Sequence, residues 1–168
     1  MLSIGHRGRP GKPRYGENTI FSFDMALRAG AKALKFDVRM TKDGQLIVIH
    51  DLDIARTTNG KGNVRAFTYE DLVQFNAGFG DRIPLLSEVL ERYSVGVLLN
   101  IEIKESGIEK KVLDSIQSCV KLHPFAQKVM VSAFDSDDND PDADSSWDQL
   151  AIFRKKYPDC PSRPEVEN

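Results

Sequence analysis

Hydrophobic and polar residues alternate strictly over residues 34–40. Because successive side chains of a β-strand point to opposite faces, this pattern predicts a strand with one apolar face. The other face carries Lys35, Asp37 and Arg39. An Asp-Gly pair at positions 43–44 predicts a tight turn directly after this strand. The stretch therefore begins a two-stranded unit in which charged side chains share one face.

The second strand of this unit, residues 46–49, is aliphatic throughout and leads into His50 and Asp51. A fully apolar strand is typical of parallel sheets that are buried on both faces. Enzymes with such sheets place their chemistry at the carboxyl ends of the strands, which makes His50 a candidate for a site. A lysine–aspartate ion pair on an exposed strand, with a surface histidine, is the alternative interpretation.

Similar patterns predict the remaining elements. Apolar runs predict strands at 2–5, 95–105 and 128–134, and residues spaced by three and four predict helices at about 18–29, 87–93, 108–122 and 146–157. Asn18 or Thr19 is the expected N-cap of the first helix, and a short helix is expected from Thr68 through Phe75. Residues 52–66 are expected to form a long polar loop. Strands that alternate with helices predict an α/β fold with a largely parallel sheet.

Polar residues follow two more of these strands. His6 and Arg7 lie between two glycines after the first strand, where the two side chains could bind a phosphate. Glu102 and Lys104 alternate with isoleucines at the end of the strand within 95–105. A solvated N-terminal loop and a strand that emerges into solvent are the alternative interpretations of these two groups.

Composition narrows the choice of partner. The 168 residues suit one domain with a sizeable core, and a formal net charge of −2 argues against nucleic acid and acidic membranes as partners. No apolar run is long enough to span a membrane, and no secretory leader is visible, so a cytoplasmic protein with reduced cysteines is expected. The acidic run at 135–145 lacks the glycine and final glutamate of a calcium-binding EF-hand loop and is expected to be a disordered insertion.

Seven short blocks occur in an order that resembles the glycerophosphodiester phosphodiesterase family. They are His6-Arg7-Gly8, Glu17-Asn18-Thr19, Phe36-Asp37-Val38 with Thr41-Lys42-Asp43-Gly44, His50-Asp51, Arg56-Thr57-Thr58 with Gly60, Ile83-Pro84-Leu85, and Asn100-Ile101-Glu102-Ile103-Lys104. The resemblance covers residues 2–134 and extends more weakly to 157. Each block alone is weak evidence, whereas all of them in order and at suitable spacing are specific.

The resemblance implies a TIM (β/α)8 barrel with its site at the C-terminal end of the strands. It implies hydrolysis of a glycerophosphodiester to sn-glycerol 3-phosphate and an alcohol, with a divalent cation, Mg²⁺ or Ca²⁺, as cofactor. By the same resemblance, His6 and His50 are the general acid and base, and Asp37 and Glu102 bind the metal. The implied substrate-binding residues are Arg7 and Lys104, which contact the phosphate, and Glu17 and Asn18, which support them.

The sequence departs from the family in two respects. The family has Glu-x-Asp in the strand at 34–40, and here Lys35 occupies the glutamate position. Lys35 should point into the site with Asp37, pair with Asp37 and Glu102, and weaken metal binding. A TIM barrel also needs about 250 residues, so residues 1–168 are expected to form one partial barrel domain of about five to six βα units.

These departures leave two functions open: a phosphodiesterase with impaired activity, or a non-catalytic relative that binds phosphodiesters or a protein partner. An incomplete barrel should also expose a sheet edge and apolar helix faces, from which self-association is expected.

Overall fold

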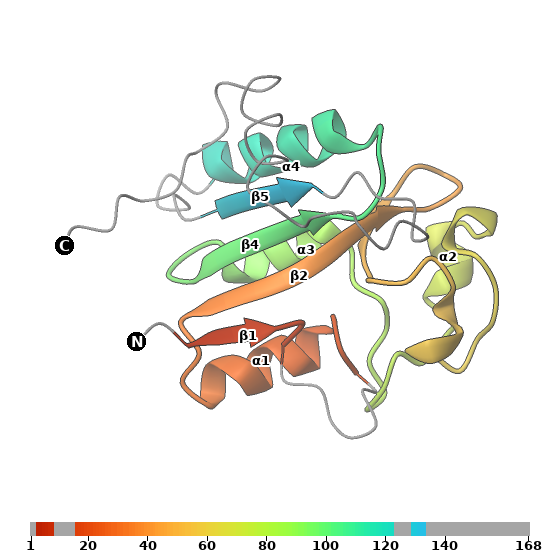
Figure 1. Ribbon diagram of the computed structural model, residues 1–168, viewed down its shortest axis with the longest axis horizontal. Coiled ribbons are helices and arrows are strands. Elements are labelled where there is room, and N and C mark those ends of the chain that lie inside the picture. Colours follow the sequence, from red (N-terminus) through yellow and green to blue (C-terminus); the bar gives the residue numbers. More distant parts are fainter. Residues whose placement is uncertain (1–2, 9–15, 123–128, 134–168) are drawn as a thin grey trace, which may run out of the picture.

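The computed structural model describes residues 3–8, 16–122 and 129–133, which form one sheet with helices on one face. Four strands run parallel in the order β1 (Ile4–His6), β2 (Ala33–Met40), β4 (Leu98–Ile103) and β5 (Val129–Ala133) (Figure 1). A fifth strand, β3 (Leu46–Val48), pairs with β2. The α/β class and the order of elements are as the sequence predicts.

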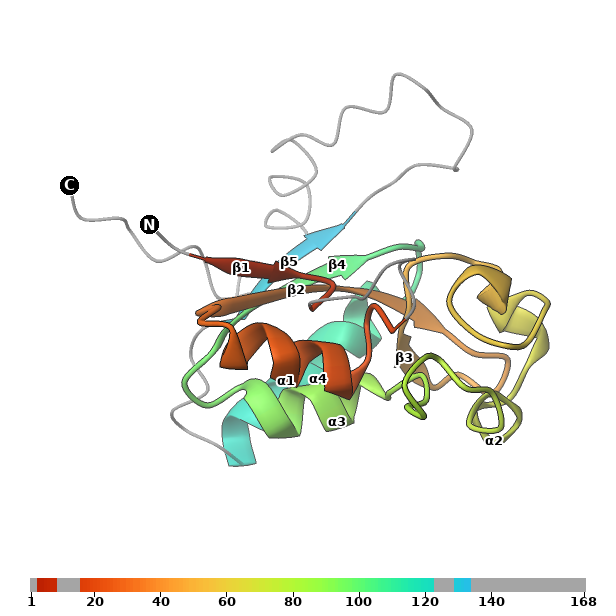
Figure 2. The same cartoon turned by 90° about the horizontal axis from the view of Figure 1, so that it is seen from below.

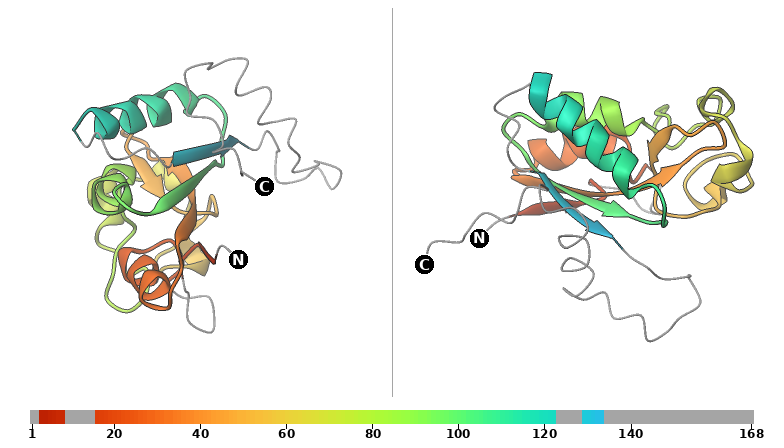
Figure 3. Two further views of the ribbon diagram at one scale, coloured as in Figure 1. Left: turned by 90° about the vertical axis from the view of Figure 1, so that its left-hand side faces the viewer. Right: turned by 90° about the horizontal axis from the view of Figure 1, so that it is seen from above.

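Three helices cover the same face of this sheet: α1 (Ile20–Arg28), α3 (Leu86–Tyr93) and α4 (Glu109–Leu122) (Figure 2). Both views in Figure 3 place the three helices on one side and the strands on the other. The main hydrophobic core lies between these layers and includes Phe23 and Phe36, both fully buried. None of the helices in the described part of the chain is long and apolar enough to cross a membrane.

The alternation in β2 separates the two faces of the sheet. Leu34, Phe36 and Val38 point into the helix-covered core, and each is 0% exposed. Lys35 and Asp37 point to the opposite face, which we call the polar face. The register aligns Asp37 of β2 with Glu102 of β4, so carboxylates of two neighbouring strands lie side by side on the polar face.

The strand β3 runs antiparallel to β2, as the predicted tight turn between them requires, and this corrects the parallel setting that its aliphatic sequence suggests. The turn that reverses the chain is closed by Thr41 N, which donates to Gln45 O at 2.9 Å, and Gly44 adopts a φ of 81°. Glycine adopts such a conformation without steric cost. β3 is aliphatic on both sides because its side chains enter two different hydrophobic clusters, with Val48 in the main core and Ile47 in a second one.

The second cluster lies under residues 51–85. The part of this segment that the sequence suggests is a long polar loop, residues 52–66, is more ordered than expected. The chain forms two 3₁₀ turns, Ile54–Arg56 and Val64–Ala66, and the helix α2 (Tyr69–Leu72), which ends earlier than expected. Thr68 caps α2 in the predicted capping box. Buried apolar residues close this cluster: Ile47, Ile49, Ile54, Val64, Leu72, Ala77 and Ile83. A small core of its own therefore fixes the segment that follows His50.

Several sequence predictions concern residues outside the described ranges. They include the acidic run at 135–145, the helix at 146–157 and the chain beyond β5. The described part holds four parallel strands, whereas five to six βα units are expected for the whole chain. Within this part, β1 and β5 each pair with only one other strand and form the edges of the sheet.

Candidate functional site

The first group of polar residues follows β1. Arg7 has a φ of 56° and donates its backbone N–H to Lys35 O at 2.7 Å, which directs the chain away from the sheet. Gly8 has a φ of 83°, and a Cβ there would lie 2.6 Å from the carbonyl carbon of Ser22. Only glycine fits this close approach to α1. His6 and Arg7 are thereby held at the carboxyl end of β1, where His6 aligns with Lys35 of β2.

Glu17 and Asn18 form the loop before α1, and both are 3% exposed. Glu17 accepts hydrogen bonds from Arg7 Nη1 at 3.1 Å and from Arg56 Nη1 and Nη2 at 3.0 and 2.7 Å. Burial alone would raise the pKa of the Glu17 carboxyl, but Arg56 and Arg7 outweigh it and lower that pKa. Glu17 is thus an anion that orients two guanidinium groups.

Asn18 adopts a φ of 57° and donates its amide Nδ2 to Asp37 Oδ2 at 3.0 Å. A positive φ in a residue other than glycine is uncommon, and asparagine is among the residues that tolerate it best. The next residue, Thr19, is the N-cap of α1, with a capping box to Ser22. Of the two candidates for the cap, Thr19 is therefore the cap, and the Asn18 side chain is directed to the site.

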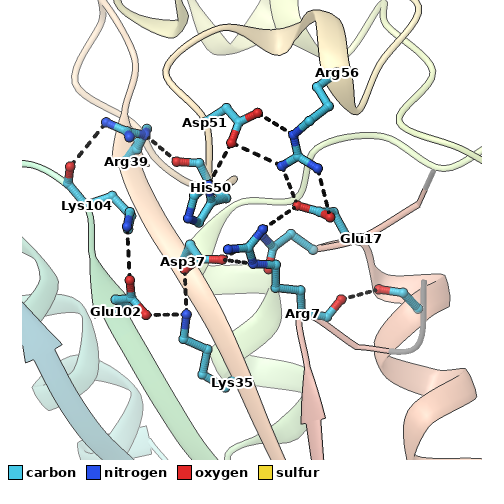
Figure 4. Close-up of polar contacts among 12 residues, drawn as sticks. Arg7, Glu17, Lys35, Asp37, Arg39, His50, Asp51, Arg56, Glu102 and Lys104 are labelled. Atoms are coloured by element: carbon cyan, nitrogen blue, oxygen red, sulfur yellow. Dashed lines mark hydrogen bonds and ion pairs between the residues drawn. The ribbon is translucent and has the colours of Figure 1, made fainter. Parts of the chain in front are cut away.

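Lys35, Asp37 and Glu102 form the centre of the polar face (Figure 4). The ammonium of Lys35 contacts both carboxylates, with Nζ 2.9 Å from Asp37 Oδ1 and in direct contact with Glu102 Oε2. Lys104 Nζ lies 3.1 Å from Glu102 Oε1, and Arg7 Nε lies 3.2 Å from Asp37 Oδ2. The predicted pairing of Lys35 with these two carboxylates is what the structure shows.

Asp37 is 0% exposed, and burial of its charge is unfavourable by itself. The charged and hydrogen-bonding groups around it offset this desolvation. Burial alone would raise the pKa of the Asp37 carboxyl, but the Lys35 ammonium, the Asn18 hydrogen bond and the Arg7 guanidinium together lower it. Asp37 is therefore a carboxylate at neutral pH and remains one into the acid range.

His50 reaches the polar face from the end of the β3 hairpin. Its Nδ1 lies 2.7 Å from Asp51 Oδ1, and its carbonyl accepts from Arg39 Nε at 2.7 Å. Burial alone would raise the pKa of Asp51, but hydrogen bonds from Arg56 and His50 outweigh it and lower it to about 2. An ionised Asp51 accepts from Nδ1–H, which leaves Nε2 as the ring atom that can meet a substrate.

His6 lies on the same face beside Lys35. Partial burial, the Lys35 ammonium and the Arg7 guanidinium lower the pKa of its imidazole below the ordinary 6.5. A neutral imidazole at pH 7 can accept a proton, as a general base must.

The carboxylates do not fit a divalent cation in this arrangement. Oxygen ligands of the type carried by Asp37 and Glu102 suit Mg²⁺ and Ca²⁺. Here, however, one lysine ammonium bridges them, and Lys104 and Arg7 take further carboxylate oxygens. Among the described residues, no group of three histidine, cysteine, aspartate or glutamate side chains is arranged to hold a metal ion. A cation would have to displace Lys35 first.

The polar face brings together the residues that the sequence singled out, with His50 and Glu102 at the same end of the sheet beside Asp37. Ile49 N donates to Asp37 O at 3.0 Å, which places the His50 backbone next to that strand. Two arginines for which the sequence predicted no role also belong to this group of polar-face residues. Arg39 links the carbonyls of His50 and Lys104, and Arg56 links Glu17 to Asp51. Arg39 could have been found from its place on the Lys35–Asp37 face of β2.

The parallel sheet and the helices that cover one of its faces are part of an α/β barrel. A profile of the glycerophosphoryl diester phosphodiesterase family matches residues 6–158. The chain belongs to that family.

Two relatives and one solved structure illustrate the relationship. The chain is 41% identical over 146 residues to a glycerophosphodiester phosphodiesterase of Caldanaerobacter subterraneus, covering 79% of this chain and 58% of the relative. It is 41% identical over 169 residues to a glycerophosphodiester phosphodiesterase of Bacillus altitudinis, covering 92% of this chain and 62% of the relative.

The solved structure is that of an Oleispira antarctica phosphodiesterase in complex with the product sn-glycerol-3-phosphate. The two chains are 26% identical with a TM-score of 0.70, over 95% of this chain and 63% of that one. The chain thus has the TIM-barrel fold of these proteins in part, and spans about three fifths of the length of the relatives that it matches.

Proposed function

We propose that this chain contributes the site of a glycerophosphodiester phosphodiesterase, which hydrolyses a glycerophosphodiester to sn-glycerol 3-phosphate and an alcohol. The observation that carries the proposal is the convergence of two histidines and three cations at one end of the sheet, in a chain of this family. A phosphodiester needs neutralisation of its charge, an activated attacking oxygen and a protonated leaving group. The polar face has residues for each of these tasks.

Arg7 and Lys104 bind the phosphate oxygens in this proposal. Each is oriented by a carboxylate, Arg7 by Glu17 and Lys104 by Glu102, so each holds its position before the substrate arrives. Glu17 acts through Arg7, and the Asn18 amide is oriented by Asp37. Such fixed positive charges stabilise the negative charge that develops on the phosphoryl oxygens during the reaction.

His6 and His50 carry the proton transfers. His6, with its lowered pKa, accepts a proton from the attacking water as the water oxygen forms the new bond to phosphorus. His50, oriented through Nδ1 by Asp51, donates a proton from Nε2 to the alcohol oxygen as its bond to phosphorus breaks. The pair of histidines thereby balances the protons of the reaction without a change in the net charge of the site.

The Mg²⁺ or Ca²⁺ that the family resemblance implies has no step in this proposal, because the carboxylates that would hold it are paired with Lys35. Asp37 and Glu102 would hold a cation only once position 35 lacks its ammonium. We expect weak binding of either ion to the unmodified protein.

The proposal is tested by incubating the purified protein with glycerophosphocholine and with glycerophosphoethanolamine, each with EDTA and with added Mg²⁺ or Ca²⁺. Release of sn-glycerol 3-phosphate, lost on His50→Gln, supports it. A protein that folds cooperatively and releases no sn-glycerol 3-phosphate from either substrate in any condition contradicts it.

The second candidate function is binding of a phosphodiester without turnover. The double ion pair of Lys35 favours it, since this pair holds both carboxylates in a fixed arrangement. Binding of glycerophosphocholine that leaves the compound intact after prolonged incubation would select this function.

A further inference from the structure

The charged groups that contact one another around Lys35 carry a net positive charge without a metal ion. Three cations, Arg7, Lys35 and Lys104, contact two carboxylates, Asp37 and Glu102. Their formal charges leave an excess of one positive charge, which matches the single negative charge of a phosphodiester. Glu17, which also contacts Arg7, is paired in turn with Arg56. A glutamate at position 35 would turn this excess into one negative charge, and a bound divalent cation would then restore one positive charge. The lysine therefore gives the same net charge that a glutamate gives only together with a divalent ion.

We propose that the Lys35 ammonium serves as a built-in replacement for a divalent cation, so that this site binds the phosphate group of a glycerol phosphate ester independently of metal. The inference rests on the proposed function for the class of ligand. It goes further in naming Lys35 as a ligand-binding residue and in separating anion binding from any cofactor.

The position of Lys35 supports direct contact with an anion. Its side chain is 13% exposed, and it extends between two carboxylates on the polar face rather than into solvent. An ammonium has three protons, and the two carboxylate contacts leave capacity for a third acceptor. His6, the neighbour of Lys35 in the sheet, lies on the same face, so an anion bound by the ammonium also lies beside a candidate catalytic base.

Two buried atoms next to Asp37 have hydrogen-bonding capacity that the described residues do not use. Asn18 Oδ1 has no partner there, while Nδ2 of the same amide is fixed by Asp37. Because a carboxylate only accepts hydrogen bonds, Asp37 determines which way this amide faces. Arg7 Nε lies 3.2 Å from Asp37 but is not aligned for a hydrogen bond. In a bound glycerol phosphate ester, a glycerol hydroxyl would donate to Asn18 Oδ1, and an ester oxygen would accept from Arg7 Nε.

The test measures binding rather than turnover. The probe is sn-glycerol 3-phosphate, which is not a substrate for diester hydrolysis, titrated by calorimetry in EDTA and again with Mg²⁺ or Ca²⁺. We expect binding in EDTA, with an affinity that changes less than about twofold on addition of either ion. Lys35→Met removes the ammonium and keeps an unbranched side chain, and should weaken binding in EDTA at least about tenfold, as expected for a hydrogen bond to a charged group.

Lys35→Glu gives the complementary result. This variant should lose binding in EDTA, gain a calorimetric signal for Mg²⁺ or Ca²⁺ alone, and recover binding of the probe when the ion is present. The matched control is Lys32→Glu, which makes the same change of charge at an exposed position just before β2, at the opposite end of that strand. It should bind the probe as the unmodified protein does.

Three results overturn the inference. They are binding of the probe only when Mg²⁺ or Ca²⁺ is present, tight binding of either ion by the unmodified protein that Lys35→Glu leaves unchanged, and binding in EDTA that Lys35→Met leaves unchanged. Should Lys35→Met not unfold cooperatively, the EDTA and metal titrations of the unmodified protein decide the question, with Lys35→Arg as the variant that keeps the charge.

The two proposals fail separately. Hydrolysis of glycerophosphocholine that requires Mg²⁺ would leave the proposed function standing and overturn the role of Lys35. Binding of the probe in EDTA without any hydrolysis would overturn the proposed function and support the role of Lys35.

Discussion

Both faces of β2 bury side chains, but the two faces are stabilised in different ways. Phe36 and Asp37 are neighbours in sequence, and both are 0% exposed. Burial of a phenyl ring is favourable by about 1.5–3 kcal/mol and does not depend on direction. Burial of a carboxylate is unfavourable unless charged and hydrogen-bonding groups surround it in good geometry. The helix-covered face therefore stabilises the fold, and the polar face depends on that stability to hold its charges in place.

Because of this difference, the two faces tolerate different kinds of substitution. The core between the sheet and the helices accepts changes that keep volume and apolarity. On the polar face each carboxylate has named partners, such as Asn18 and Lys35 for Asp37, and removal of one partner leaves a buried charge without compensation. Core variants should thus change stability, whereas polar-face variants should change chemistry and should lower stability as well wherever they leave a buried charge unpaired.

The largest expected effect on stability comes from Phe36→Ala. Its ring packs against Phe23 at a centroid distance of 5.7 Å in the main core, and its removal should lower the free energy of unfolding by about 3–5 kcal/mol. Urea denaturation followed by circular dichroism measures the loss. The control Lys32→Ala, at an exposed position, should change it by less than about 0.5 kcal/mol. A loss below about 1 kcal/mol for Phe36→Ala would mean that the core does not supply the stability assigned to it.

The opposite result is expected for His50→Gln on the polar face. If His50 transfers a proton to the leaving alcohol, this change should lower kcat by about 10²–10⁴-fold. It should change the free energy of unfolding far less than Phe36→Ala, because the His50 ring is partly exposed. The measurement is release of sn-glycerol 3-phosphate, and the matched control is His123→Gln, for which we propose no role. Equal losses of activity in the two variants would remove His50 from the mechanism.

The sequence alone predicted the fold where periodicity was strict. Alternation in residues 34–40 and the stripe in residues 108–122 both identified elements that the structure shows as β2 and α4. It could not reveal that the β3 side chains enter two different clusters, because a short aliphatic run has the same pattern in either setting. It also missed the order in residues 52–66, because the apolar residues that close the second cluster are far apart in sequence.

For the candidate site, polar residues at strand ends indicated where the site lies, and the family resemblance named the carboxylates and the histidines, whose roles stay predictions. The spacing of Lys35 and Asp37 on one strand also predicted their ion pair, since residues two apart share a face. The role of Arg56 was not predictable in this way. It joins Glu17 and Asp51, and the contact with Glu17 spans 39 positions that are brought together only by the packing of residues 51–85 against the loop before α1.

A third, smaller effect should appear at acid pH. The pKa values of Glu17, Asp37 and Asp51 are lowered in the folded protein, that of Asp51 from 3.8 to about 2. Because the unfolded chain binds protons more readily than these folded carboxyls, their contribution to stability is complete above the unfolded pKa and is lost as pH falls toward the folded one. The free energy of unfolding should thus decline as pH falls from about 4 to about 2.

Arg56→Met sharpens this test, because Arg56 is a principal cause of the lowered pKa of Asp51 and Glu17. The variant should be less stable at pH 6 and should lose less additional stability on acidification. Urea denaturation at a series of pH values measures both. A slope with pH as steep as that of the unmodified protein would show that Arg56 does not hold these carboxyls in their ionised form.

The smallest effect is expected where the two faces meet, at Thr19. Its hydroxyl accepts from Ser22 N at 3.2 Å at the start of α1 and donates to Gly16 O at 2.8 Å, so it links the packed helix to the loop that carries Glu17 and Asn18. Thr19→Ala should lower the free energy of unfolding by about 1 kcal/mol, the typical loss for an N-cap.

Thr19→Ala should leave kcat nearly unchanged. The loop keeps an anchor of its own in the hydrogen bond from Asn18 N to Arg7 O at 3.0 Å. Thr19→Ser retains the hydroxyl and is the matched control, expected to behave as the unmodified protein in both measurements. If Thr19→Ala instead reduced kcat by tenfold or more with unchanged stability, the cap would serve the polar face rather than the helix. The separation between a stabilising face and a chemical face would then fail at this junction.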